Sequence, residues 1–211
     1  KTKNPFSEFK LSHLNTKTMK RALSKADIIK IMDADCSKQT EQRQLAHDIF
    51  CFSYLCGGIS LVDIANLTPL NIIDGRLIYQ RQKTHGSINL LLSDKAMQII
   101  AKYHRYQRIA NYFFPILHCR RHITPMQKHN RVRKMCREIN RELKALAEEL
   151  GITANITTYV ARHTFATILK KSGVNIGIIS QALGHQDIKT TQIYLSKFDN
   201  EQIDEAMKHL L

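Results

Sequence analysis

The chain has 211 residues, of which 43% are hydrophobic, so it is long enough to fold around one sizeable core. Its 32 lysines and arginines outnumber 18 acidic residues and give a formal net charge of +14. This charge indicates a polyanionic partner such as nucleic acid, with a merely basic surface as the alternative. Five scattered cysteines without a CxxC pair argue against a disulfide framework, and no apolar run reaches membrane-spanning length. We therefore expect a cytoplasmic protein that binds nucleic acid.

The first third of the chain predicts three helices after a polar start. Residues 1–20 are polar and are expected to be a linker or the tail of a missing domain. Ser24 is placed to cap a first helix. Apolar residues recur at helical spacing from Leu45 to Cys56 and predict a second helix, which Gly57 and Gly58 end. Residues 59–67 predict a short third helix.

Between residues 71 and 92 the periodicity changes to that of strands. Turn signals at 74–75 and 84–86 separate three short apolar runs, which predict a three-stranded antiparallel meander. Further helices are expected after Ser93, from about His129 to Glu149, in short pieces from residue 159 onward, and over 199–211, with an irregular basic segment at 111–127. The predicted fold class is mainly α with a small three-stranded antiparallel sheet (α+β).

The segment 159–194 gathers three side chains suited to phosphodiester chemistry. Arg162 can clamp a phosphate with two parallel hydrogen bonds. His185 can transfer a proton near neutral pH, and Tyr194 can act as the nucleophile of a covalent intermediate. Residue types and spacing together predict one site.

The motif formed by these residues resembles that of a known family. Tyr159-x-x-Arg162-His163, then Leu183-Gly184-His185, then Tyr194 resembles the late motif of tyrosine site-specific recombinases, also called phage-type integrases. The segment RQKTHG resembles the lysine hairpin of that family, with Lys83 as its lysine. The resemblance implies a catalytic domain over 21–211 with a C-terminal tail helix. It also implies that residues 1–20 are the linker from an N-terminal core-binding domain.

The resemblance implies roles for four residues. Tyr194 would attack a backbone phosphorus and form a 3′-phosphotyrosine, while Arg162 stabilises the developing charge. His185 would bond the phosphate or assist the proton of Tyr194, and Lys83 would protonate the 5′-oxygen that leaves. The covalent bond conserves the phosphodiester energy, so the resemblance implies no cofactor, no metal and no ATP.

The resemblance also implies a biological setting. The expected activity is DNA recombination, with integration or excision of a mobile element, in the bacterial cytoplasm and on the nucleoid when DNA is bound. Expected partners are double-stranded DNA attachment sites, further copies of the chain in a tetramer joined through the C-terminal helix, and accessory DNA-bending proteins. No membrane partner is expected. The sequence does not specify the target site, because specificity depends on base contacts and DNA shape.

One departure from the family pattern concerns its first arginine, because Ser60 stands at that position. Arg81 is the first candidate to replace it. It lies two residues before Lys83, so strand alternation would put both side chains on one face of the sheet. Arg76 is a weaker candidate. The alternative is that Arg81 is a solvated strand residue.

A second departure is Tyr159, which stands where the family usually has histidine. Its hydroxyl can bond the phosphate or a neighbouring side chain, but it is a poor base at neutral pH, so the proton role would fall on His185. Alternatively, Tyr159 packs under the site. His163 follows Arg162 directly, so it is expected to point elsewhere, where it would either support a site residue or pack against its own helix.

Basic residues outside the motif suggest where DNA lies. The helix after residue 129 carries a basic face away from its apolar stripe, and this face either contacts DNA or is simply solvated. The DNA contacts expected on it are Arg131, Arg133, Lys134 and Arg137. The loop before it contains His118, Cys119 and His122, which with His129 raise the alternative of a zinc site. Their spacing fits no common zinc pattern, so the loop is expected to approach the phosphate backbone instead.

Two rival functions remain at this point. A type IB topoisomerase-like enzyme would use the same covalent chemistry only to nick and rejoin. A catalytically degenerate DNA-binding module would account for Ser60 and Tyr159. Retention of Lys83, Arg162, His185 and Tyr194 together favours an enzyme.

Overall fold

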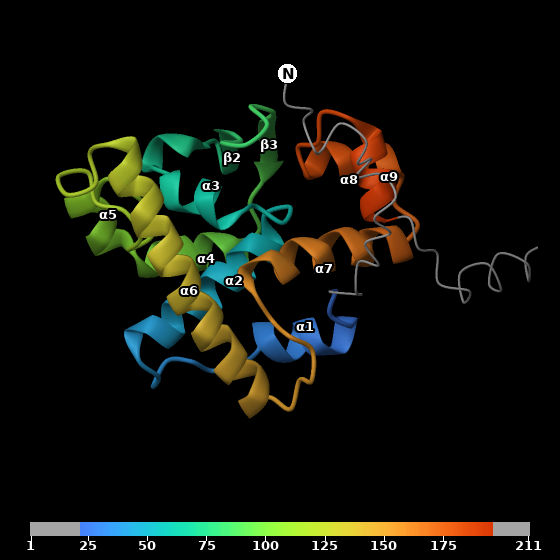
Figure 1. Cartoon of the computed structure of the whole chain (residues 1–211), viewed down its shortest axis with the longest axis horizontal. Helices are drawn as coiled ribbons and strands as arrows, with labels where there is room; N and C mark the ends of the chain where they lie inside the picture. The colour runs from blue at the N-terminus through green and yellow to red at the C-terminus, as the bar shows by residue number, and fades with distance from the viewer. Residues whose placement is uncertain (1–21, 196–211) are drawn as a thin grey trace, which may run out of the picture.

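The computed structural model describes residues 22–195 and, within that range, leaves the side chains of Ile193 and Tyr194 undescribed. The expected linker over 1–20 and the expected helix over 199–211 lie outside the described residues. Figure 1 shows the described part as helices gathered around a central helix α2, with a small sheet at one edge.

The first three helices begin where short polar side chains cap them. They are α1 (Lys25–Met32), α2 (Glu41–Leu55) and α3 (Leu61–Asn66). The hydroxyls of Ser24, Thr40 and Ser60 each accept the backbone N–H of the third helical residue. Gly57 and Gly58 follow α2 with φ of +72° and +69°, a conformation that favours glycine. The three predicted helices and the predicted end of the second are confirmed.

The predicted meander is also confirmed. A short 3₁₀ turn (η2, Pro69–Asn71) leads into β1 (Ile72–Ile73), β2 (Arg76–Gln80) and β3 (Ser87–Leu91). All pairs are antiparallel in the order β1-β2-β3, and the register pairs Gln80 with Ser87 at the hairpin end. The turn at Asp74 and Gly75 has positive φ at both residues, as tight hairpin turns require.

The middle of the chain differs from expectation at two boundaries. Helix α4 (Asp94–Lys102) is followed by a separate helix α5 (His104–Ala110), which the sequence pattern does not distinguish from it. Helix α6 (Pro125–Glu149) begins before His129. The Thr124 hydroxyl accepts the N–H of Gln127, whose side chain bonds back to Thr124, and proline is tolerated at the first helical position.

The main core lies on α2, which packs against α4 and α6 and against α7 (Thr158–Lys171). Phe50 and Phe52 are fully buried there, and the Phe52 ring meets Phe114 edge-on with centroids 5.1 Å apart. Burying each such side chain contributes roughly 1.5–3 kcal/mol. Because α7 carries Arg162, this packing holds that residue on the rigid body of the domain.

A second, smaller apolar cluster positions the end of the described chain. Helices α8 (Ile176–Ala182) and α9 (Ile188–Tyr194) follow α7, and the cluster consists of Ala166, Ile179, Leu183 and Leu195. In Figure 1, α8 and α9 lie together beside one end of α7. Among the described residues, no helix combines the length and apolar character needed to cross a lipid bilayer.

Candidate active site

Arg162 lies at the centre of the candidate site and is held by carbonyls from two distant segments. Its side chain leaves α7 and is 3% exposed. Nη1 donates to the carbonyl of Gly58 at 2.9 Å, and Nη2 donates to the carbonyl of Leu183 at 2.5 Å. A Cβ on residue 58 would lie 2.8 Å from Cα and Cγ of Arg162, so the arginine packs directly on the backbone after α2. The guanidinium is therefore fixed in orientation before any substrate binds.

His185 contacts Arg162 on one side and helix α9 on the other. Its Nε2 lies 3.1 Å from Nη2 of Arg162, and its Nδ1 lies 2.7 Å from the hydroxyl of Thr191. Burial, and then the positive charges of Arg162 and Arg81, lower the pKa of His185 to about 4. The imidazole is therefore neutral at pH 7.

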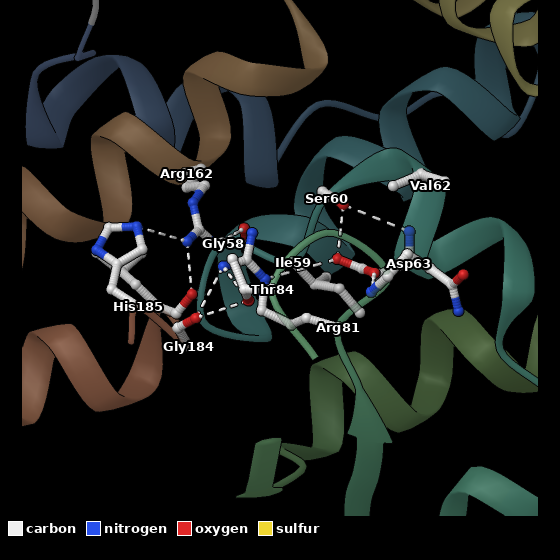
Figure 2. A network of polar contacts seen from close by, with 12 residues as sticks. Gly58, Ile59, Ser60, Val62, Asp63, Arg81, Thr84, Arg162, Gly184 and His185 are labelled. Atoms are coloured by element: carbon white, nitrogen blue, oxygen red, sulfur yellow. Dashed lines mark hydrogen bonds and ion pairs between the residues drawn. The ribbon is translucent and has the colours of Figure 1, made fainter. Parts of the chain in front are cut away.

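Arg81 lies in the same site, and Figure 2 shows its side chain reaching toward Gly184 beside Arg162. Its Nη1 donates to the Gly184 carbonyl at 2.9 Å, and its side chain is 6% exposed. The alternative of a solvated Arg81 is therefore wrong. Because Arg162 bonds the carbonyl of Leu183 and Arg81 bonds that of Gly184, one loop holds two guanidinium groups.

The prediction that Arg81 and Lys83 share one face of a strand is wrong, because β2 ends at Gln80 and neither residue lies on it. Arg81 closes the hairpin through its N–H to the Gly86 carbonyl, and exposed Lys83 lies in the turn between them. Arg76 is exposed and bonds Asn89 at the other end of β2. At about 3.3 Å per residue it starts roughly 16 Å along the chain from Arg81, which removes it as a candidate.

The turn that carries Lys83 is tied to the loop before α9. The Thr84 hydroxyl donates to the Gly184 carbonyl at 3.1 Å, and the Gln186 side-chain amide donates to the Thr84 carbonyl at 2.6 Å. A Cβ on residue 184 would lie 2.5 Å from Cδ of Arg81, so only glycine lets the arginine stem pass. The base of the hairpin and the motif Leu183-Gly184-His185 therefore form one structural unit.

The hydroxyl of Ser60 is used at the start of α3, where it caps the helix. It donates to Asp63 Oδ2 at 2.6 Å and accepts the N–H of the same residue. Asp63 is 2% exposed, accepts the N–H of Gln82 at 2.8 Å, and lies 3.9 Å from Nε of Arg81. Figure 2 shows Asp63 between Ser60 and Arg81. A buried carboxylate thus connects the position of the missing arginine to the arginine that enters from the hairpin.

Tyr159 and His163 lie together on α7. The two rings meet edge-on at 4.7 Å, as residues four apart on a helix do, and Tyr159 is 48% exposed. The alternative of a tyrosine packed under the site is therefore wrong. His163 thus contacts a residue of its own helix, which is one of the two roles expected for it.

Tyr194 is the last residue of α9, and its side chain lies outside the described part of the structure. The backbone nevertheless places it one helical turn after Thr191, whose hydroxyl contacts His185. Sequence reasoning missed both Thr191 and Asp63. What distinguishes Thr191 and Asp63 is that they are polar but buried, and the burial of these two positions is known only from the three-dimensional structure.

The four expected DNA contacts on α6 differ in their surroundings. Arg131 is half-buried and donates to the Ile116 carbonyl at 3.0 Å, so it supports the loop before the helix. Lys134 pairs with Glu138 at 3.9 Å, and Arg133 and Arg137 are exposed. Within residues 22–195, no group of three or more histidine, cysteine or acidic side chains is placed to hold a metal ion, which gives the zinc alternative no ligand set there.

The family model described as "Phage integrase family" matches residues 21–201. The chain belongs to the phage integrase family. A tyrosine recombinase of Thermosipho africanus (strain TCF52B) is 27% identical over 153 residues, which cover 72% of this chain and 50% of that protein. This member of the phage integrase family thus spans about half the length of that curated relative.

Solved structures show the same fold. The crystal structure of XerA recombinase has a TM-score of 0.64 at 20% identity, and the match covers 91% of this chain and 66% of that one. The Tn1549 transposon integrase in complex with transposon right-end DNA also has a TM-score of 0.64, at 18% identity, with 99% and 72% covered. The predicted fold class, mainly α with a small antiparallel sheet, is confirmed.

Proposed function

We propose that this chain is the catalytic part of a recombinase that cuts and rejoins DNA at specific sites through a 3′-phosphotyrosine. The observation that carries the proposal is the convergence of Arg162, Arg81 and His185 on the loop that leads into α9. Two preorganised guanidinium groups and a neutral imidazole, beside the helix that bears Tyr194, suit one phosphodiester group.

In the proposed cleavage step, the hydroxyl oxygen of Tyr194 forms a bond to phosphorus, and the bond from phosphorus to the 5′-oxygen breaks. Only about one in a thousand free tyrosines is ionised at pH 7, so the phenol proton needs an acceptor. His185 Nε2 takes that proton, and a bound phosphate favours the transfer by raising the pKa of His185 above its value of about 4. Lys83 gives a proton to the departing 5′-oxygen, and rejoining reverses both transfers.

The two arginines carry the electrostatic part of the proposal. Arg162 and Arg81 would both face the nonbridging oxygens, with Arg81 in the role of the arginine that Ser60 replaces. Buried guanidinium groups already held by backbone carbonyls need little rearrangement when charge develops, which is the physical source of such catalysis. The phosphodiester energy stays in the phosphotyrosine, so the proposed reaction requires neither ATP nor a metal ion.

Residues around the site extend the proposal to DNA binding. Tyr159 is half-exposed on the same helix as Arg162, which suits a hydrogen bond to the DNA backbone better than a proton-transfer role. On α6, Arg133, Lys134 and Arg137 would meet the phosphate backbone, and Arg131 would contribute by holding the loop that follows Phe114. The net charge of +14 supports this binding mode.

The wider biological role is also a proposal. The likeness in fold to the Tn1549 transposon integrase, together with serine at position 60, supports integration and excision of a mobile element in a bacterial cell, at the nucleoid. We propose attachment sites in double-stranded DNA as substrates, accessory DNA-bending proteins as further partners, and residues 1–20 as a linker from a core-binding domain. Residues 199–211 would join protomers in a tetramer. Deleting them should abolish assembly on DNA, and unchanged assembly would contradict this role.

The test is a covalent-adduct assay with a nicked suicide substrate that carries the attachment site. The full-length protein should form an adduct that survives denaturant, and Tyr194→Phe should form none. No adduct under any condition would favour the degenerate DNA-binding module. An adduct that only religates, without strand exchange between two duplexes, would favour the topoisomerase-like alternative.

A further inference from the structure

Thr191 is a buried polar residue that the proposed mechanism does not yet use. It lies on α9, is 0% exposed, and its hydroxyl is 2.7 Å from Nδ1 of His185. Its neighbour Thr190 points to solvent. A threonine buried on the nucleophile helix, six residues after the histidine it contacts, is placed to act through that histidine.

The hydrogen-bond partners of His185 determine which of its ring nitrogens carries the proton. Arginine has no acceptor, so Nη2 of Arg162 must donate to Nε2 of His185, which therefore presents its lone pair. A neutral imidazole has one N–H, and that hydrogen must lie on Nδ1. Nδ1 then donates to the Thr191 hydroxyl. The two contacts, one on each side of the ring, are compatible with this tautomer alone.

We infer that Thr191 is a positioning residue that, together with Arg162, holds His185 in the Nδ1–H tautomer. The lone pair then stays on Nε2, which can accept the proton of Tyr194 once Nη2 of Arg162 turns from the ring to the bound phosphate. The inference rests on the proposed function for its catalytic consequence, but the tautomer itself does not. Because Thr191 lies on the helix that carries Tyr194, the same hydrogen bond also ties the imidazole to the nucleophile helix.

The expected size of the effect is taken from metal sites, in which a second residue orients a metal-binding histidine. Loss of such an outer partner typically costs about 10- to 100-fold in activity. Without the hydroxyl, the ring can place its proton on Nε2, where it no longer accepts a proton and opposes the N–H of Arg162. Two charged groups that lower the pKa of the ring, Arg162 from α7 and Arg81 from the hairpin, are unchanged by a substitution at residue 191.

Three variants separate this role from simple packing. Thr191→Val keeps the shape and removes the hydroxyl, Thr191→Ser keeps the hydroxyl, and Thr190→Val is the matched exposed control. In single-turnover cleavage of the suicide substrate, Thr191→Val should be about 10- to 100-fold slower at unchanged DNA affinity. Thr191→Ser should recover most of the rate, and Thr190→Val should match the parent. Parental cleavage by Thr191→Val, or failure of Thr191→Ser to recover the rate, would overturn the inference.

A second measurement does not depend on catalysis. In protein labelled with ¹⁵N-histidine, with the His185 signals assigned by their loss in His185→Gln, the ring nitrogen shifts at pH 7 report the tautomer directly. The Nδ1–H form should dominate in the parent and in Thr191→Ser, and should give way in Thr191→Val. An Nε2–H form in the parent overturns the inference. If the parent shows the Nδ1–H form but cleaves no DNA, the proposed function fails while the positioning by Thr191 stands.

Discussion

Removing Arg81 tests the second guanidinium of the site. Arg81→Ala deletes the group that bonds the Gly184 carbonyl and, in the proposal, one of two charges on the phosphate. Loss of one preorganised stabilising group typically lowers the rate about 10²- to 10³-fold, or roughly 2.7–4 kcal/mol. We expect that loss in single-turnover cleavage of the suicide substrate. Arg76→Ala, at the far exposed end of β2, is the matched control and should cleave like the parent.

The same substitution also affects folding, and this effect must be measured separately. Asp63 is 2% exposed, and Arg81 lies 3.9 Å away, so Arg81→Ala leaves a buried carboxylate without that cation. Such a loss costs up to about 3–5 kcal/mol, and the hydrogen bonds from Ser60 and Gln82 to Asp63 reduce it. Urea unfolding measures this cost. Arg81→Lys keeps a charge but lacks the planar fork, so it should recover stability better than rate.

A compensating change makes the test sharper. Ser60→Arg in the Arg81→Ala background returns an arginine to the position where the family normally carries it, at the cost of the α3 cap, about 1 kcal/mol. We expect it to restore at least part of the lost cleavage rate. If Arg81→Ala is folded and cleaves at the parental rate, then Arg81 does not replace the missing arginine.

Two further predictions concern the surroundings of Arg162. The pKa of His185 is about 4 in the folded protein and roughly 6.5 in an unfolded chain. Between these pH values the unfolded state binds more protons than the folded state. The free energy of unfolding should therefore fall by about 1–3 kcal/mol as the pH drops from 6.5 to 4. In urea unfolding measured at a series of pH values, the free energy of unfolding of His185→Gln should change less with pH than that of the parent. An identical pH dependence in both proteins would contradict the neutral state assigned to His185. Gly58→Ala should destabilise the domain by at least about 2 kcal/mol, through its positive φ and the clash with Arg162. Gly75→Ala, with a similar φ and open space, should cost only about 1–2 kcal/mol, and equal losses would show that the contact with Arg162 is unimportant.

Local signals predicted most of the elements. Helix starts at Ser24 and Ser93 and the turn at Asp74-Gly75 depend on contacts within three or four residues, so the sequence was enough to find them. The start of α6 was missed because the capping box of Thr124 and Gln127 lies in a segment whose prolines suggested a loop. Boundaries of this kind depend on which of two local signals the surrounding packing favours.

The candidate site was predictable in its residue types and less so in its geometry. Arg162 lies on α7, His185 in the loop between α8 and α9, and Tyr194 on α9, so their order and spacing carried the prediction. Arg81 was named by an argument that required β2 to continue, whereas the chain turns there and buries the side chain against Gly184. Contacts between residues about 100 positions apart decide that outcome, and no local pattern encodes them.

The ties between the β2–β3 hairpin and the loop before α9 have a mechanical consequence. Thr84 and Gln186 link the turn of Lys83 to the segment that leads directly to Tyr194. A movement of that segment must either carry the turn along or break these hydrogen bonds, each worth about 0.5–1.5 kcal/mol. Lys83, the proposed acid, and Tyr194, the proposed nucleophile, are therefore expected to move together. A conformation that holds one in place while the other moves away loses the hydrogen bonds of Thr84 and Gln186.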